Sequence, residues 1–194
     1  MDNNKVKYGL SNVVIWPIES TDTTGKPTYG EKIIIPGAVD LTMDPEEDAT
    51  PFYADNVVYY MTQSNNGYSG TLEIALVPET FYSKVLGQRT DNAGVMVEST
   101  DDKAREFAMA FQFEGDQHAI RHLFPRCTAG RTSVSGHTKE ESIDPQTEEL
   151  NLNALGRIDN KIAKLKCKQS SEAYETWLDN PYEPNFTASG KEGA

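Results

Sequence analysis

Apolar and polar residues alternate along much of the chain, and this alternation is its dominant pattern. Successive side chains of a β-strand point to opposite faces, so each alternating run places its apolar residues on one side. Five such runs predict an antiparallel sheet with one buried face. Further candidate strands span 57–62, 95–98 and 118–127. The apolar residues of the five runs are Val39, Leu41 and Met43; Leu72, Ile74 and Leu76; Phe107, Met109, Phe111 and Phe113; Leu150 and Leu152; and Ala163, Leu165 and Cys167.

Turn and helix signals separate these runs. The segment 64–70 is rich in Asn and Gly, which tolerate positive φ, and it predicts a hairpin turn between two strands. Residues 78–86 predict a short helix, with proline in its first turn and Gly87 after its end. Residues 171–179 predict a second short helix, with a serine cap and helical spacing of the apolar residues.

Together these elements predict an all-β fold, an antiparallel β-sandwich or barrel with one or two short flanking helices. The 194 residues suffice for one domain with a sizeable core, which we place at 1–184. Two polar stretches, 44–55 and 128–145, are expected to be extended loops of this domain. The polar residues 185–194 are expected to form a flexible C-terminal tail.

The charge balance narrows the classes of function. Acidic residues outnumber basic residues 30 to 18, which gives a net charge of −12. Tight binding of nucleic acid needs a cationic surface, so this composition argues against a nucleic-acid-binding protein. No apolar run approaches the ~20 residues of a transmembrane helix, and we predict no membrane association. Two cysteines, Cys127 and Cys167, do not make a disulfide framework, which favours a reduced cytoplasmic origin.

Motifs for catalysis and cofactor binding are missing from the sequence. It contains no GxSxG nucleophile elbow, no GxGxxG and no GxxxxGK[ST] phosphate loop. His118 and His122 on a strand would lie roughly 13 Å apart, too far for one metal ion. We therefore predict no catalytic residue, cofactor or metal. Two alternatives stay open: a glycoside hydrolase whose carboxylate pair does not stand out, and an aromatic carbohydrate platform formed by Tyr53, Tyr59 and Tyr60.

A basic stretch interrupts the acidic composition. Residues 157–168 contain five basic residues and one acidic residue. If Leu165 faces inward, Lys164 and Lys166 line the opposite face of the strand. These lysines have two interpretations. They protect an edge strand against aggregation, or they form a basic patch that meets an acidic loop of an identical neighbour.

A set of short segments occurs in a characteristic order along the chain. They are 7–13 (KYGLSNV), 35–39 (IPGAV), 51–56 (PFYADN) with Tyr59-Tyr60, 64–75 (SNNGYSGTLEIA), 119–122 (AIRH) and 138–143 (TKEESI). The resemblance that these segments carry covers residues from about 7 to 183, nearly the whole chain. As an ordered set they resemble the phi13-type family of phage major tail proteins.

This resemblance implies a structural virion protein, the major tail tube subunit of a long non-contractile tail. Related subunits form hexameric rings that stack into a hollow tube, through which double-stranded DNA passes transiently and without sequence specificity. The resemblance also implies assembly in the host bacterial cytoplasm, and contacts with the tape measure, tail terminator and distal tail proteins of the same phage. It implies no catalytic residues and no cofactors. The alternative is a phage-associated carbohydrate-binding or adhesin β-module.

The tube hypothesis assigns roles to charged and aromatic residues. An anionic wall keeps DNA mobile, because a cationic wall would hold phosphates through counterion release. The residues that we expect to line the lumen are Asp40, Asp44, Glu73, Glu106 and Glu149. The residues that we expect at contacts between subunits are Glu46, Glu47, Asp48, Phe52, Tyr53, Arg131, Glu140, Glu141, Lys164 and Lys166.

Overall fold

The computed structural model describes residues 4–138 and 145–186. Its regular structure is almost entirely antiparallel β, which confirms the predicted all-β sandwich class. A helix, α1 (Glu79–Lys84), confirms the first predicted helix in a shorter form. The strands are β1 (Lys7–Thr21), β2 (Pro27–Tyr29), β3 (Ile33–Ile34), β4 (Ala38–Ala54), β5 (Val57–Ile74), β6 (Arg89–Thr90), β7 (Met96–Val97), β8 (Phe107–Gly115), β9 (Ile120–Ala129), β10 (Glu148–Ala154) and β11 (Leu165–Lys168).

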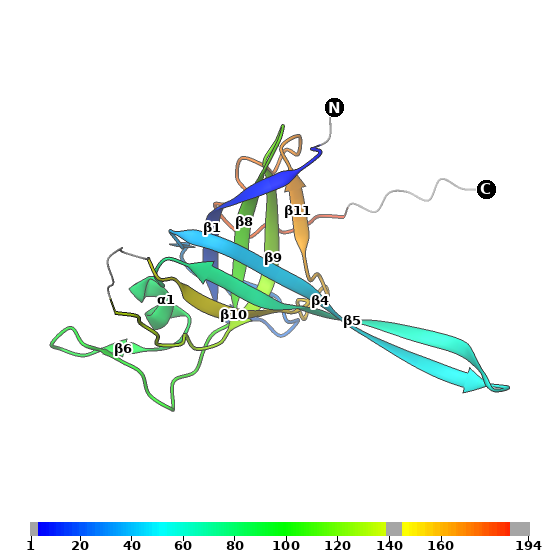
Figure 1. Ribbon diagram of the computed structural model, residues 1–194, viewed down its shortest axis with the longest axis horizontal. Coiled ribbons are helices and arrows are strands. Elements are labelled where there is room, and N and C mark those ends of the chain that lie inside the picture. Colours follow the sequence, from blue (N-terminus) through cyan, green and yellow to red (C-terminus); the bar gives the residue numbers. More distant parts are fainter. Residues whose placement is uncertain (1–3, 139–144, 187–194) are drawn as a thin grey trace.

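The strands form one large curved sheet in the order β2-β1-β8-β9-β10-β5-β4, with β3 paired to β1 and β11 paired to β9. In Figure 1, β4, β5 and β10 run across β1, β8 and β9, so the sheet folds over itself around a core. Ile15 and Met109 from one half belong to the same buried cluster as Leu72 and Leu150 from the other. Phe81 of α1 extends this cluster at one end. The small β6–β7 hairpin is a separate sheet.

The expectation of a single buried face is wrong for the centre of the sheet. In β8, Phe107 and Met109 face the main core, while Ala108 and Ala110 are equally buried in a second apolar cluster. Trp177, from the C-terminal segment, covers these alanines on the far side of the sheet. Alanine is small enough to let this third layer pack closely. The molecule therefore has three layers at its centre.

The second predicted helix is also wrong, because residues 171–179 form consecutive turns. The amide of Tyr174 bonds to the carbonyl of Ser171 at 3.0 Å, and that of Trp177 bonds to the carbonyl of Tyr174 at 3.3 Å. The three-residue spacing of these turns places the side chains of Tyr174 and Trp177 on the same side, where both pack against the sheet. Tyr174 donates to the carbonyl of Ala119 and Trp177 to that of His122. Tertiary packing has overridden local helix preference.

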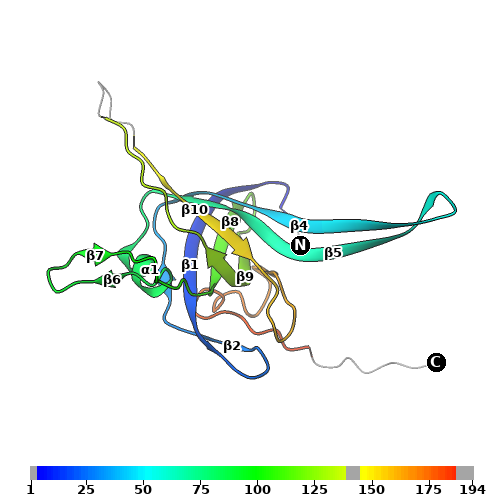
Figure 2. The same cartoon turned by 90° about the horizontal axis from the view of Figure 1, so that it is seen from below.

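The predicted loop at 44–55 is wrong, as is the predicted turn at 64–70. Both segments belong to one long β4–β5 hairpin, which projects from the body in both views (Figures 1 and 2). Its turn lies at Asp55 and Asn56, whose φ angles of 52° and 61° suit a tight hairpin turn. A ribbon exposed on both faces needs no apolar alternation, so its sequence resembles that of a loop.

The other predicted flexible segments lie partly outside the described residues. In the 128–145 stretch, residues 128–129 end β9 and residues 130–138 follow without regular structure. Glu140 and Glu141 lie outside the described residues, as does most of the predicted C-terminal tail.

Candidate functional surfaces

Three of the predicted lumen residues form one row across the sheet. In β4, Asp40 is directly opposite Glu73 of β5, and Glu73 is directly opposite Glu149 of β10. Directly opposed residues share a face, so the three carboxylates lie side by side; we call them the acidic row. Thr147 donates a hydrogen bond to Glu73 at 2.5 Å. No lysine or arginine forms an ion pair with this row among the described residues.

The acidic row belongs to a larger polar face on β4, β5 and β10. The next rows are Thr42–Thr71–Asn151 and Asp44–Ser69–Asn153, and these nine residues are the polar face. On the opposite side of the same strands, Leu72, Leu150 and Leu152 are buried in the core. Like charges opposite each other destabilise a sheet. The acidic row therefore lowers the stability of the fold, and this favours a role outside folding.

Glu106, the fifth predicted lumen residue, lies elsewhere. Its carboxylate receives two hydrogen bonds from Arg126 of β9, one from Nε at 2.8 Å and one from a terminal nitrogen at 2.6 Å. This hydrogen-bonded pairing raises the pKa of Arg126. The charge of Glu106 is thus compensated within the chain, and we do not count it with the polar face.

The outer halves of β4 and β5 carry an acidic base and an apolar tip. We call residues 46–66 the arm. Glu46, Glu47 and Asp48 are exposed near its base, where Ser69 donates to Glu46 and Asn66 donates to Asp48. An isolated two-stranded ribbon is marginally stable, and a cluster of exposed apolar residues marks an interaction surface. The apolar tip comprises Phe52, Tyr53, Val57, Val58, Tyr59, Tyr60 and Met61, each between 47% and 72% exposed.

The tyrosines of the tip do not form one flat platform. Phe52 lies opposite Tyr60, so these two rings share a face of the ribbon, while Tyr53 follows Phe52 on the other face. Tyr59 has no partner in the register, because the pairing shifts there. This arrangement does not favour the carbohydrate-binding alternative, which needs coplanar rings on one side.

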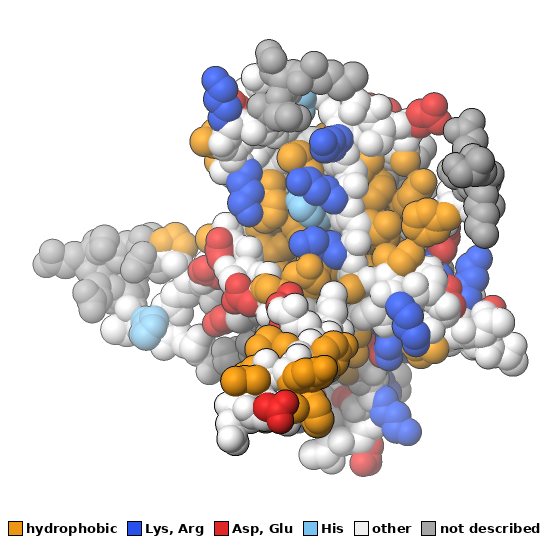
Figure 3. Space-filling model, turned by 90° about the vertical axis from the view of Figure 1, so that its right-hand side faces the viewer, with side chains coloured by type: hydrophobic (Ala, Val, Ile, Leu, Met, Phe, Trp, Pro, Cys, Tyr) orange, Lys and Arg blue, Asp and Glu red, His pale blue; other side chains and the backbone are white. Residues whose placement is uncertain are grey.

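A basic patch surrounds His122 on β9. We define it as Lys7, His122, Lys164 and Lys166. Lys166 is directly opposite His122 in the β9–β11 pairing. The Nζ atoms of Lys7 and Lys164 lie 4.7 Å from the ring centroids of Phe113 and Tyr68, respectively. In Figure 3, which looks onto the side from which the arm projects, Lys and Arg side chains gather around a histidine.

The lysines of the basic patch lie close enough to His122 to affect its pKa. The imidazole stacks on Phe111 with ring centroids 5.3 Å apart. Burial lowers the pKa of His122 to about 4, and Lys166, Lys164 and Lys7 add to this effect. At neutral pH the histidine is therefore uncharged, and the lysines carry the positive charge of the patch. Since β11 pairs only with β9 among the described strands, both interpretations of its lysines remain compatible with its position.

Arg131, another predicted contact residue, is exposed and forms an ion pair with Glu98 at 3.2 Å. The pair connects the segment after β9 with the segment after β7. Exposed pairs of this kind contribute little to stability.

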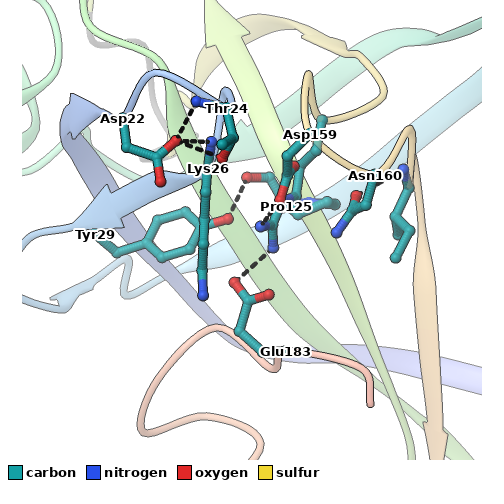
Figure 4. A network of polar contacts seen from close by, with 10 residues as sticks. Asp22, Thr24, Lys26, Tyr29, Pro125, Asp159, Asn160 and Glu183 are labelled. Carbon is teal, nitrogen blue, oxygen red and sulfur yellow. Dashed lines mark hydrogen bonds and ion pairs between the residues drawn. The ribbon is translucent and has the colours of Figure 1, made fainter. Parts of the chain in front are cut away.

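A buried cation that the sequence analysis missed joins the C-terminal segment to the body, where it is bound by Asp159 and Glu183, which are labelled in Figure 4. Arg157 is 2% exposed and is bound by Asp159 through two hydrogen bonds and by Glu183 at 2.6 Å. Nearby, Tyr29 donates to the carbonyl of Pro125 at 3.0 Å, and burial raises the pKa of its hydroxyl. We call this cluster the arginine clasp. Its one cation is bound by two carboxylates of the same chain, so we assign the cluster a structural role.

Two kinds of site are not found in the part of the chain that the structure describes. No group of three or more His, Cys, Asp or Glu side chains could hold a metal ion. No described helix has the length and apolarity to cross a membrane.

Comparison with known proteins identifies the family. The family model described as phage tail tube protein matches residues 1–155. This range contains the polar face and the arm, and it ends before β11. No curated protein matches the chain. Because the match covers most of the 194 residues, the chain belongs to the phage tail tube protein family and is a structural protein of a phage tail.

Proposed function

We propose that copies of this chain form hexameric rings that stack into the hollow tube of a phage tail, with the polar face lining the lumen. The observation that carries this proposal is the acidic row, in which Asp40, Glu73 and Glu149 lie side by side without a cation among the described residues. The role is structural and not enzymatic. The subunit contacts itself and the tape measure, terminator and distal tail proteins, after assembly in the host bacterial cytoplasm.

The position of β4 supports closure of a ring. β4 is the last strand of the sheet order, so its outer edge pairs with no described strand. A neighbour joined at this edge would continue the polar face around a bore. Closed symmetric assemblies use such head-to-tail contacts, and pairing would also cover the exposed backbone groups of an edge strand.

The chemistry of the polar face suits the passage of DNA. A cationic wall would bind phosphates by releasing counterions, and each contact would have to break as the duplex moved. Carboxylates repel phosphates over about 8–10 Å at physiological salt, which leaves a hydrated gap. Asn and Thr side chains between the carboxylates keep the wall wet without adding positive charge.

Charge reversal of the acidic row tests this role. We expect virions with Asp40→Lys, Glu73→Lys and Glu149→Lys to retain tubes and to eject DNA more slowly than wild type. A neutral triple variant, with Asn at position 40 and Gln at positions 73 and 149, should eject DNA at a rate between those of the lysine variant and wild type. Electron microscopy would count subunits per ring, and ejection would be followed by fluorescence of a DNA-binding dye.

A matched control separates the effect of charge on the polar face from the effect of the net charge of the chain. The triple variant Glu31→Lys, Glu172→Lys and Glu175→Lys changes the net charge equally, at exposed positions away from the polar face. It should eject DNA as wild type does. Normal ejection by the acidic-row variant would refute the lumen assignment, and a solitary monomer in the native particle would refute the tube itself.

A further inference from the structure

The main core of the molecule is complete without the C-terminal part of the chain. Among the described residues, every buried member of its apolar cluster lies between Val13 and Ala154. This range falls inside the segment 1–155 that matches the tail tube family. The strands of the main sheet order also come from this segment, whereas β11 pairs with β9 off that path. The residues after 162 therefore form an added layer.

We call residues 163–186 the strap. Within it, β11 pairs with the start of β9 and lies beside that strand in Figure 1. The other residues of the strap form turns or have no regular structure. Its buried side chains are Cys167, Tyr174 and Trp177, and all three belong to the second apolar cluster, on the far side of the sheet from the main core. The strap thus buries its apolar residues against one face of the sheet.

The face of the sheet under the strap is apolar, and we call it the covered face. Trp16 belongs to it and is 1% exposed, and its indole N–H has no hydrogen-bond acceptor in the described part of the chain. A buried donor without a partner costs free energy, and this donor would bond to water if the strap lifted. The residues of the covered face are Val14, Trp16, Ala108, Ala110 and Leu123.

Polar contacts near the end of the strap hold it closed. Glu183 accepts a hydrogen bond from Arg157 at 2.6 Å, and its side chain is 42% exposed. Asp179 forms an ion pair with Lys32 at 3.7 Å, and exposed pairs of this kind contribute little to stability. Arg157 keeps its two hydrogen bonds to Asp159 if Glu183 leaves. These contacts can therefore break without leaving a buried charge unpaired in the body.

We propose that the strap opens and closes as one unit while the main core stays folded, and that the closed strap keeps the covered face from contacting other copies. Segments with few buried contacts open at a lower free energy than the core does, and they open as cooperative units. An exposed apolar face promotes association between copies. The strap acts in the single subunit, so the proposal does not depend on the hexameric tube.

The two cysteines of the chain lie on the two sides of this division. Cys167 belongs to the strap and Cys127 to the main core, and both thiols are free and buried. The variants Cys127→Ala and Cys167→Ala each leave one thiol, whose reaction with Ellman's reagent in dilute native protein measures opening. Each rate is divided by the rate of the same thiol in urea-unfolded chain. We expect Cys167 to react roughly 100-fold faster than Cys127.

Substitutions in the two layers should affect the two thiols differently. Leu72→Ala, in the main core, should speed the reaction of Cys127 roughly 30-fold and leave that of Cys167 unchanged, because the strap opens without the core. Trp177→Ala removes the largest buried side chain of the strap and should speed the reaction of Cys167 roughly 100-fold. Glu183→Gln keeps the packing and should speed it about fivefold.

Sedimentation of the same variants tests the protective role of the strap. At a concentration at which wild type is monomeric, Trp177→Ala should self-associate through the covered face. Leu72→Ala is the matched control, because it destabilises the main core and leaves the strap closed. It should stay monomeric.

Each outcome decides one part of the proposal. Equal rates at Cys127 and Cys167, or equal acceleration of both by Leu72→Ala, overturn the strap as a separate unit. If Trp177→Ala loses its circular dichroism spectrum, Glu183→Gln decides instead, and an unchanged rate at Cys167 overturns the proposal. Trp177→Ala protein that reacts fast at Cys167 and stays monomeric overturns the protective role. None of these results bears on the tube, which the acidic-row variants test separately.

Discussion

Neutralising the central carboxylate of the acidic row should stabilise the monomer. Glu73 has a like charge on each side, Asp40 on β4 and Glu149 on β10. Side chains directly opposite each other have Cβ atoms about 5 Å apart, so we take the charges to be about 6 Å apart. Each repulsion then amounts to about 0.5–1 kcal/mol at low salt and an exposed surface. Glu73→Gln removes two repulsions and should raise the free energy of unfolding by about 1–2 kcal/mol.

The neighbouring variants provide the internal comparison. Asp40→Asn and Glu149→Gln each remove one repulsion, so each should give about half of the gain of Glu73→Gln. Glutamine still offers an oxygen to the hydroxyl of Thr147, so the hydrogen bond to this residue is retained. A gain of about 1 kcal/mol corresponds to a rise in Tm of about 2–4 °C for a chain of this size.

Urea unfolding of dilute monomer at about 20 mM and about 1 M salt measures these differences. At the higher salt concentration the screening length falls to about 3 Å, and the gains should disappear. Glu175→Gln, at an exposed position in the C-terminal turns, controls for the loss of one net charge. The reasoning is refuted if Glu73→Gln gains no more than the flanking variants, or if the gains do not depend on salt.

Three further perturbations follow from the structure. Gly67→Ala places a methyl group 2.1 Å from a carbonyl oxygen at a φ of 101°. Urea unfolding of this variant should show a free energy of unfolding lower by about 2 kcal/mol or more. Gly94→Ala has open space around the new methyl group and should lose only about 1 kcal/mol, from backbone strain. Arg157→Met leaves two carboxylates unpaired and should cost about 3 kcal/mol; Glu183→Gln, at the more exposed end of the arginine clasp, should cost about 1 kcal/mol in the same assay. The pKa of His122 is held at about 4 in the folded state, below its ordinary value of 6.5, so the unfolded chain binds the proton first as the pH falls. The free energy of unfolding should therefore decrease by about 2 kcal/mol between pH 6.5 and about 4, after allowance for partial exposure. His122→Gln should lack this part of the decline, and an identical pH profile would contradict the assignment.

Local patterns in the sequence were sufficient for the fold class and for much of the candidate site. Alternation identified strands such as β8 and β10, since side-chain direction in a strand depends only on neighbouring residues. The same rule placed Asp40, Glu73 and Glu149 on the polar sides of their strands. The absence of catalytic motifs and the ordered family segments directed the interpretation towards a structural tail protein, which the family match then supported.

Features that depend on distant residues required the folded chain. Val13–Trp16 in β1 is buried throughout, because a third layer covers the face of the sheet that alternation would leave exposed. Residues 171–179 form consecutive turns instead of the expected helix, and these turns pack Trp177 against the sheet. The segments 44–55 and 64–70 were mistaken for a loop and a turn, since a ribbon without a buried face carries no periodic signal. The acidic row and the basic patch exist only through strand register, which pairs residues from segments far apart in the chain. Side-chain direction is a local property of the backbone, whereas which strands become neighbours is settled by the packing of the whole core.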